Sequence, residues 1–165
     1  MSSVSPHTFA TLSTSSLHSA DGKNVLSGVG AEVDSECHTP RLRRSFLTDG
    51  IKTTNGDKDY WHSCGGDAWA KFALPSGTFP VSSVHVTNRC DGCCPERLAG
   101  ARVLIASSNG SETLCGTIGV IGVCQTAVVQ CDGLAGAKVV VRGNAGVGDG
   151  ASLNIVEVEA YAGHH

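Results

Sequence analysis

Eight cysteines in 165 residues limit both what this chain can fold into and where it can fold. An even number of cysteines in a short, glycine-rich chain is typical of secreted or cell-surface domains held by disulfides. A structural zinc site would need two close cysteine pairs, whereas the sequence has one, Cys90 and Cys93, followed directly by Cys94. Adjacent cysteines rarely bind one metal ion, because their side chains diverge. We therefore expect disulfides, and a structural metal or free thiols remain the alternative.

Charge and composition narrow the classes of function. The chain has 12 Lys and Arg against 15 Asp and Glu, a net charge of −3. Without a basic excess it lacks the electrostatic footprint of a nucleic-acid-binding protein. No apolar run approaches the ~18 residues of a membrane-spanning helix, so we expect no membrane insertion either. The catalytic signatures Gly-x-Ser-x-Gly and His-Glu-x-x-His and a Gly-rich phosphate loop are all missing, so we expect no enzyme.

The chain divides into a leader, one domain and a short tail. Residues 1–22 are rich in Ser and Thr without periodicity, which indicates a flexible leader. The domain is expected over residues 23–162, and residues 163–165 are a tail or the remnant of a tag. The leader has no apolar core of a signal peptide, so we expect that a signal was removed or that a larger precursor was cut. The sequon Asn109-Gly110-Ser111 agrees with a secreted or extracellular chain.

β-Branched segments that end at turn residues recur along the domain and predict strands. The clearest segments are 81–88, 101–106, 127–131, 138–142 and 156–160. The segments 101–106 and 127–131 stop at Asn-Gly and Asp-Gly, which are strong turn signals. The last segment alternates apolar residues with carboxylates, so we expect one buried face and one exposed face. Because no amphipathic helix of three turns is evident, the pattern predicts an all-β antiparallel sandwich or barrel.

The densest chemistry lies in one loop between two of these strands. Its ten residues contain Arg89, Asp91, Arg97 and the adjacent Cys93 and Cys94. Arginine offers a planar fork of donors, which a nearby carboxylate can hold in place. A disulfide between adjacent cysteines would add a flat apolar surface, so the loop suits a sugar, whose hydroxyls accept and whose C–H face is apolar. The plainer alternative is a surface salt bridge beside a structural disulfide.

Several motifs in and around this loop resemble one known family. Within the loop region they are Val86-Thr87-Asn88-Arg89, Asp91, Cys93-Cys94, Glu96-Arg97-Leu98, Gly100 and Val103. Elsewhere, in the same order as in the family, they are Asn24-Val25, Thr48-Asp49-Gly50, Asp67-Ala68-Trp69, Cys115-Gly116-Thr117 with Cys131, and Val156-Glu157-Val158-Glu159-Ala160-Tyr161. Together they resemble the F-type lectins, or fucolectins, which are fucose-binding members of the discoidin group. The resemblance covers about residues 22–162 and implies a discoidin-like jelly-roll β-sandwich.

The resemblance also implies a sugar site made by a histidine and two basic residues. Arg89 and Arg97 match the two basic positions, Asp91 would brace them, and His62 is the best candidate for the histidine. Two spacings depart from the family. The 26 residues between His62 and Arg89 are two too many, and Gly92 adds one residue between Asp91 and Arg97. Since glycine tolerates unusual backbone angles, the insertion is either a harmless bulge or the loss of the site.

Two disulfides follow from the same resemblance. Cys93 and Cys94 would form a vicinal disulfide against which the sugar packs, and Cys115 would pair with Cys131. Cys90 is an addition to the family motif. Its partner stays open among the remaining cysteines, Cys37, Cys64 and Cys124.

A calcium ion is the cofactor that the resemblance implies. Asp49 and Glu157 match the family's two carboxylate ligands, with backbone carbonyls near Phe46 and Ile51 in support, and hard oxygen ligands suit Ca²⁺. The ion would be structural and would tie down the loops. A family disulfide that clamps this region to the last strand is missing, because Val156 stands in place of its cysteine. The alternative is an ordinary Asp-Gly turn beside an outward-facing glutamate.

The leading hypothesis is therefore a non-catalytic lectin domain for fucose or a fucose-like sugar. It would be secreted, extracellular or on the cell surface, with glycans or glycoproteins as partners, and it could form a homo-oligomer. The second hypothesis is a discoidin-like structural or adhesion module whose degenerate sugar site has been replaced by a protein partner. The altered spacings around His62 and Gly92 favour this second hypothesis.

Overall fold

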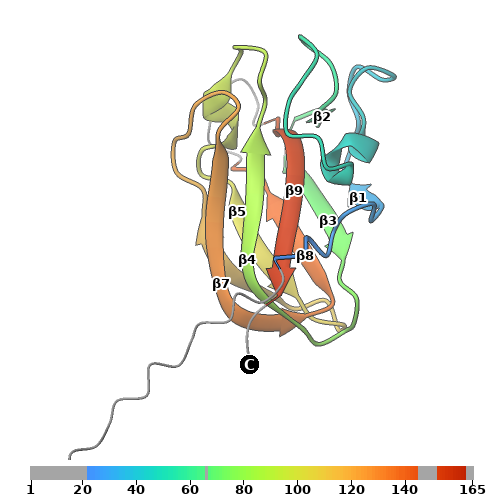
Figure 1. The fold of residues 1–165 in the computed structure, drawn as a ribbon, viewed down its shortest axis with the longest axis vertical. Helices are drawn as coiled ribbons and strands as arrows, with labels where there is room; N and C mark the ends of the chain where they lie inside the picture. The colour runs from blue at the N-terminus through green and yellow to red at the C-terminus, as the bar shows by residue number, and fades with distance from the viewer. Residues whose placement is uncertain (1–21, 66, 145–151, 163–165) are drawn as a thin grey trace, which may run out of the picture.

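The computed structural model describes residues 22–65, 67–144 and 152–162, and their strands form two antiparallel sheets packed face to face (Figure 1). The five-stranded sheet has the order β1 (Ala31–Val33), β3 (Trp69–Ala73), β8 (Lys138–Arg142), β5 (Arg102–Ala106) and β6 (Glu112–Thr117). The four-stranded sheet has the order β2 (Trp61–His62), β9 (Asn154–Ala162), β4 (Phe79–Asn88) and β7 (Thr126–Gly136). The predicted all-β sandwich is confirmed.

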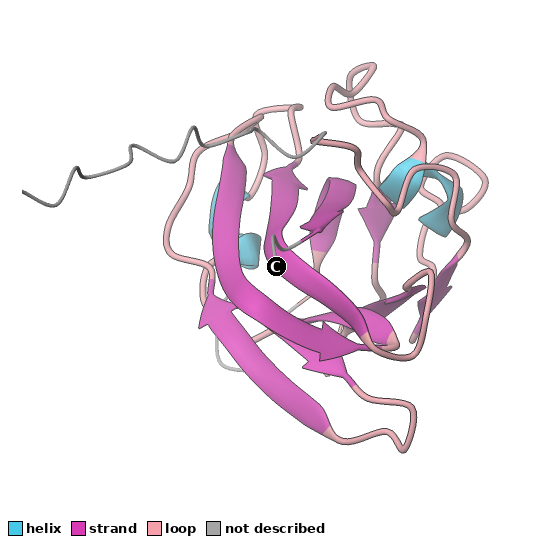
Figure 2. Ribbon diagram, turned by 60° about the horizontal axis from the view of Figure 1, so that its bottom comes forward, coloured by secondary structure: helices cyan, strands magenta, loops and turns pink. Residues whose placement is uncertain are grey.

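Helical structure in the described ranges is limited to two short 3₁₀ segments, η1 (Arg44–Thr48) and η2 (Pro95–Leu98). Figure 2 shows both of them outside the sheets, in the connecting loops. Within these same ranges, no helix has the length and apolar character needed to cross a bilayer.

The core lies between the sheets and follows from the alternation of side chains along each strand. Val81, Val84 and Val86 of β4 face Phe72 of β3 and Val141 of β8 across the interior, and all five side chains are fully buried. A bulge between Val81 and Ser83 shifts the register of β4 against both of its neighbours. The β-branched inward residues therefore account for the core. The turn expected at Asp132-Gly133 was wrong, because β7 (Thr126–Gly136) continues through these two residues, which take positive φ within the strand.

The last strand departs from the sequence expectation, because β9 is covered on both faces. Glu157 and Glu159 were expected on an exposed face, but they are 0% and 7% exposed. The loop after η1 lies over them: the Gly50 amide donates to Glu157, and the Lys52 ammonium lies 2.5 Å from the Glu159 carboxylate. The alternating pattern was correct, and the expected exposure was wrong because a distant loop supplies the cover.

One end of the sandwich is formed by the loops that lie where β4 stops. β4 spans about 30 Å along its ten residues. It ends at Asn88 next to the start of β9, and the loops at this end, drawn at the top of Figure 1, include η2 and the residues around β2. We call this end the rim. The loop that follows Asn88, with Arg89, Asp91 and Arg97, lies on the rim.

A disulfide joins the two sheets along one side. It connects Cys115 of β6 to Cys131 of β7, the edge strands of the five- and four-stranded sheets. Cys131 is buried against the core, and Cys115 packs on it from the half-buried edge. The cross-link therefore closes the sandwich where no strand pairing does.

Replacing both cysteines with alanine should lower the free energy of unfolding by about 3 kcal/mol, because a closed loop of this length restricts the unfolded chain. Urea unfolding of the Cys115→Ala/Cys131→Ala variant checks this. A loss below 1 kcal/mol would mean that the packing of β6 on β7 is sufficient without the bond.

Candidate functional site

Arg89 is the centre of the rim, and its side chain is almost completely enclosed. Its residue exposure is 5% and that of the Asp91 side chain is 7%. Nε donates to Asp91 Oδ1 at 2.6 Å, one terminal nitrogen donates to Asp91 Oδ2, and the other donates to Asn154 Oδ1. The Tyr60 ring lies 4.7 Å from the guanidinium carbon. Of the five N–H donors of the guanidinium, two are left for a ligand.

The ion pair also sets the protonation of both partners. The hydrogen bonds from Arg89 hold the pKa of Asp91 below its ordinary value, and the Cys93 amide adds to this effect. The pKa of Arg89 is raised: its burial alone would lower it, but the bond to Asp91 and the negative charges nearby outweigh that cost. The pair therefore stays ionised, and Asp91 acts as a brace that orients the guanidinium.

Asn88 fixes the two loops that flank this pair. Its side chain is fully buried, and its amide nitrogen donates to the carbonyls of Pro95 at 3.0 Å and Gly122 at 3.2 Å. Its carbonyl oxygen accepts from the Arg89 amide at 2.9 Å. A single asparagine at the end of β4 thus joins the η2 loop to the loop before β7.

The inserted Gly92 is accommodated in a left-handed turn. Its φ is +79°, a conformation that glycine adopts without steric cost, and a Cβ placed there would meet no atom within 4 Å. The insertion bulges into solvent, while Arg89 and Asp91 stay paired. Just beyond it, Cys93 and Cys94 form a disulfide between adjacent residues, with Cys93 exposed and Cys94 half-buried. The bond therefore lies on the surface of the rim.

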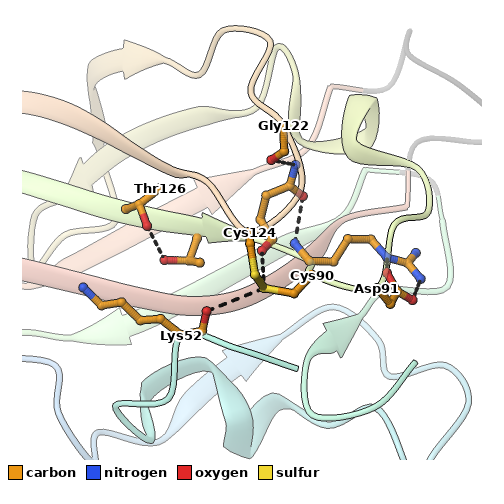
Figure 3. The surroundings of a disulfide bond; sticks show 9 residues. Lys52, Cys90, Asp91, Gly122, Cys124 and Thr126 are labelled. Atoms are coloured by element: carbon orange, nitrogen blue, oxygen red, sulfur yellow. Dashed lines mark hydrogen bonds and ion pairs between the residues drawn. A yellow bond between two sulfur atoms is a disulfide. The ribbon is translucent and has the colours of Figure 1, made fainter. Parts of the chain in front are cut away.

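The cysteine added to the motif, Cys90, is bonded to Cys124 of the loop before β7 (Figure 3). The backbone reinforces the link, because the Cys124 amide donates to the Arg89 carbonyl at 2.8 Å. On its other side, the Cys90 sulfur lies 3.6 Å from the Lys52 carbonyl, as the same figure shows. Three rim loops therefore meet at this one disulfide.

His62 lies beside the Arg89 cluster because β2 pairs with the first residues of β9. His62 is opposite Asn154, the residue that also accepts from Arg89. The pKa of His62 is lowered to about 4, chiefly by burial and also by the positive charges of His38, Arg97 and Arg89, against the opposing effect of a hydrogen bond with Asn154. Its Nδ1 is buried and has no hydrogen-bond partner in the described part of the chain. At neutral pH the ring is therefore uncharged.

The third disulfide of the rim holds the histidine segment. Cys37 is bonded to Cys64, and the Cys37 amide donates to the His62 carbonyl at 2.9 Å. The same segment brings His38 edge-on to His62, with ring centroids 5.2 Å apart. His62 is thus held from both sides, by strand pairing with β9 and by a cross-linked loop.

Arg97 lies on η2, shortly after the disulfide of Cys93 and Cys94. Its positive charge is available to a ligand. Its amide donates to the Cys94 carbonyl at 3.2 Å. Within the described ranges its guanidinium has no hydrogen bond or ion pair. It is close enough to His62 to depress the pKa of that ring. Arg89 and His62 are therefore joined through Asn154, although the sequence separates them by 26 residues, and Arg97 is on the same rim, near enough to act on His62 electrostatically.

The candidate cation ligands lie beside these residues, on the outer face of β9. Both oxygens of the fully buried Glu157 carboxylate lie 3.2 Å from the Gly50 amide. Burial raises the pKa of Glu157 to about 8, and the negative charge of Asp49 contributes. Asp49 accepts from the Ile51 amide at 2.8 Å. A buried carboxylate with one backbone donor needs either a proton or a cation, so this donor set fits a hard divalent ion.

The side chains alone do not complete a cation site. No group of three or more His, Cys, Asp or Glu residues suited to a metal ion occurs in the described part of the chain. Backbone carbonyls near Phe46 and Ile51 would have to supply the remaining ligands. Phe46 is half-buried and Ile51 is exposed, so both are accessible from the surface.

Sequence reasoning missed two residues that position Arg89. Asn154 accepts from its guanidinium, and the Tyr60 ring packs on it. Both are buried, at 0% and 2% exposure. Asn154 begins a strand and Tyr60 comes two residues before His62, and neither pattern distinguishes such residues from ordinary surface ones. Their roles depend on the pairing of β2 with β9, which no local signal reveals.

Comparison with known proteins gives relatives of one kind. Fucolectin-6 of Anguilla japonica is 34% identical over 84 residues, which are 47% of this chain and 44% of the relative. Fucolectin-4 of the same species is 35% identical over 103 residues, 57% of this chain and 54% of the relative. This chain is homologous to the fucolectins. The resemblance drawn from its loop motifs is thereby confirmed, although the chain spans only about half the length of these curated relatives. No family model matches it.

Solved structures give the same fold for the whole domain. A fucolectin from the striped bass Morone saxatilis is 27% identical with a TM-score of 0.68, covering 86% of this chain and 48% of that one. The lectin domain of lectinolysin, solved in complex with the Lewis B antigen, has a TM-score of 0.76 at 20% identity, covering 88% of this chain and 100% of that one. The expected discoidin-like sandwich of the fucose-binding modules is confirmed.

The protonation of His62 can be tested directly by NMR titration of its imidazole. We expect a midpoint near pH 4. Because the folded state holds this pKa below the ordinary value of about 6.5, protonation favours unfolding, and His62 should reduce stability as the pH falls from about 6.5 toward 4. His62→Gln should flatten the stability profile over that range. A midpoint near pH 6.5 would show that the ring is neither buried nor beside the arginines.

Proposed function

We propose that this chain is a non-catalytic carbohydrate-binding domain that takes fucose or a fucose-like sugar on its rim. The observation that carries the proposal is the convergence of Arg89, Arg97 and His62 beside the surface disulfide of Cys93 and Cys94. These groups combine directional donors with a flat apolar contact. A sugar ring requires both, because the hydroxyl groups around its edge take part in hydrogen bonds and the C–H groups on one face are apolar.

Each group has a distinct task in this proposal. Arg89 offers its two remaining N–H donors to sugar oxygens, in an orientation that Asp91 and Asn154 fix. Arg97 brings a full guanidinium fork that no described side chain engages. His62 is uncharged at neutral pH, so it forms a neutral hydrogen bond with the ligand. Because the site is held before the ligand arrives, little ordering is left for binding to cost.

The relatives support both a sugar as the ligand and a domain without catalytic activity. The similar proteins are named as fucolectins, and the structural neighbours include a fucose-binding module of Streptococcus pneumoniae and a lectin domain in complex with the Lewis B antigen. These are binding proteins or binding modules rather than catalytic domains. With glycans or glycoproteins as its partners, this domain would act outside the cell, where its four disulfides are stable.

The alternative of a decayed sugar site has less support. That alternative was based on the two altered spacings. However, the inserted Gly92 bulges into solvent and leaves the pair of Arg89 and Asp91 intact. A decayed site would have no reason to keep a buried guanidinium so fully braced. The geometry therefore favours a lectin over an adhesion module.

We further propose that Glu157 and Asp49 hold a structural Ca²⁺ ion. The support is the buried Glu157 carboxylate, whose only described hydrogen-bond donor is the Gly50 amide. When bound, the ion would supply the positive charge that this carboxylate lacks. Asp49 and the backbone near Phe46 and Ile51 would keep the loop folded over β9. The rim would gain stability, because the same loop reaches the Cys90 sulfur through the Lys52 carbonyl.

Arg97→Ala is the cleanest test of sugar binding, because its guanidinium has no structural partner among the described residues. We expect fucose affinity to fall at least about tenfold, since a hydrogen bond from a charged donor contributes about 1.5–3 kcal/mol. Calorimetry against free fucose, together with a glycan array, measures this.

Arg102→Ala is the matched control for Arg97→Ala. It removes the same charge from an exposed position on β5 and should leave the affinity for fucose unchanged. A wild-type protein that is folded but binds no glycan on the array would remove the lectin proposal in favour of the adhesion module.

Calcium should raise the melting temperature of the chain, by an amount equivalent to about 2.7 kcal/mol at a hundredfold excess over Kd. The effect should be larger at pH 8 than at pH 5.5, because the pKa of Glu157 is raised to about 8 and the ion binds the deprotonated form. Differential scanning calorimetry with and without Ca²⁺ measures both.

Glu157→Gln should abolish the calcium-dependent shift, whatever its effect on the metal-free protein. Asp132→Asn, a charge-matched change at an exposed position within β7, should retain the shift. A melting temperature that Ca²⁺ leaves unmoved at pH 8 would exclude the site.

A further inference from the structure

The turn between β5 and β6 contains the sequon Asn109-Gly110-Ser111, and its geometry presents the asparagine to solvent. The Gly110 amide donates to the Ser107 carbonyl at 3.0 Å, and the Ser107 amide donates to the Ser111 carbonyl at 2.9 Å. Asn109 is exposed at the tip of this turn. The triplet is the only Asn-x-Ser/Thr sequence in the chain.

The hydrogen bonds of Asn109 leave its amide nitrogen available. The side-chain oxygen accepts from the Ser111 amide at 2.9 Å and from the Ser107 hydroxyl at 2.5 Å. A backbone N–H can only donate, so the oxygen faces the turn and Nδ2 faces away from it. Within the described ranges Nδ2 has no hydrogen-bond partner. The Ser111 hydroxyl, which the sequon requires, lies 2.7 Å from that of Ser107.

The turn lies at the end of the sandwich opposite the rim. The Ala137 amide donates to the Ala106 carbonyl, and Gly136 pairs with Phe79 at the start of β4, whereas the rim residues gather where β4 ends. That strand separates the two ends by about 30 Å. A pocket of about 380 Å³ lies beside the turn, so an attached group would also have space on the side of the sheet. Its lining includes Ser107, Gly110, Lys71 and Lys138.

The cysteines supply the second, independent observation. No described cysteine is free, and all eight are paired. Stable pairing of this kind requires an oxidising compartment, and the secretory pathway is where sequons are modified. The chain's disulfides and its exposed sequon therefore point to the same cellular route.

We propose that Asn109 carries an N-linked glycan on the end of the domain opposite its sugar-binding rim. The Asn109 Nδ2 would form a bond to the anomeric carbon of an oligosaccharide held on a lipid pyrophosphate donor. The bond from that carbon to the pyrophosphate oxygen breaks, and the lipid pyrophosphate leaves with the electron pair. One amide proton passes to a base of the transferring enzyme. The attached glycan projects away from the rim, which stays open to ligand.

The test is secretion of the chain from a eukaryotic host, followed by intact-mass analysis before and after peptide N-glycanase. We expect a glycan mass that the enzyme removes completely, leaving aspartate at position 109 by peptide mapping. Asn109→Gln and Ser111→Ala should each abolish the added mass, and Ser111→Thr should retain it. Fucose affinity should be the same for the wild type and for Asn109→Gln, because the two sites lie at opposite ends.

Asn55-Gly56-Asp57 provides a matched control, because it is another exposed Asn-Gly turn but has Asp in place of the hydroxyl residue. Asn55→Gln should leave the glycan mass unchanged, and Asp57→Ser should add a second glycan in the same cells. The proposal is overturned if the wild-type chain carries no glycan although the same cells do glycosylate. Glycan on Asn55 of the Asp57→Ser variant, or on the cells' own secreted proteins, would show that they do. The mass readout does not depend on sugar binding, so failure of the lectin proposal would leave this result intact.

Discussion

The rim is organised around a buried arginine. Removing a guanidinium from water is costly, and here the cost is offset by a bidentate carboxylate, an asparagine oxygen and a tyrosine ring, all within reach of Arg89. These partners come from separate parts of the chain, so Arg89 can be buried only when β2, β9 and the loop after β4 are in place together. The two donors that remain therefore point in a direction set by the whole fold.

A second link unites the loops around that arginine. The bond between Cys90 and Cys124 joins the motif loop to the loop before β7, and the Lys52 carbonyl contacts the same sulfur. Lys52 also pairs with Glu159 on β9. Val156 stands where the resemblance implies a cysteine, so no disulfide fastens this loop to β9. The loop is held instead by the contact of the Lys52 carbonyl with the Cys90 sulfur and by the ion pair of Lys52 with Glu159. Both hold the Asp49 loop against the strand that carries Glu157.

The sequence predicted the sandwich well where local signals were strong. β-Branched runs located β4, β5, β7, β8 and β9, and the resemblance implied β3. β1 and β2 were missed because they are only three and two residues long, and β6 was missed because its sequence, Glu112–Thr117, has no β-branched run. The motif residues were also found locally, within one ten-residue loop. Asn154 and Tyr60 were not, since their contacts with Arg89 depend on strand pairing across the chain. The burial of Glu157 likewise required knowing that a distant loop covers β9.

The distribution of cross-links agrees with the proposed sugar site. Three of the four disulfides, those of Cys37, Cys90 and Cys93 with their partners, lie on the rim, and only one lies on the flank. An uncharged sugar offers no long-range attraction, so it must be bound by short hydrogen bonds whose strength falls steeply with misalignment. Flexible loops would lose those hydrogen bonds, and the net charge of −3 cannot compensate, because it does not attract a neutral sugar. Rigid loops around one braced arginine are therefore the physical requirement for recognising a neutral ligand at an exposed surface.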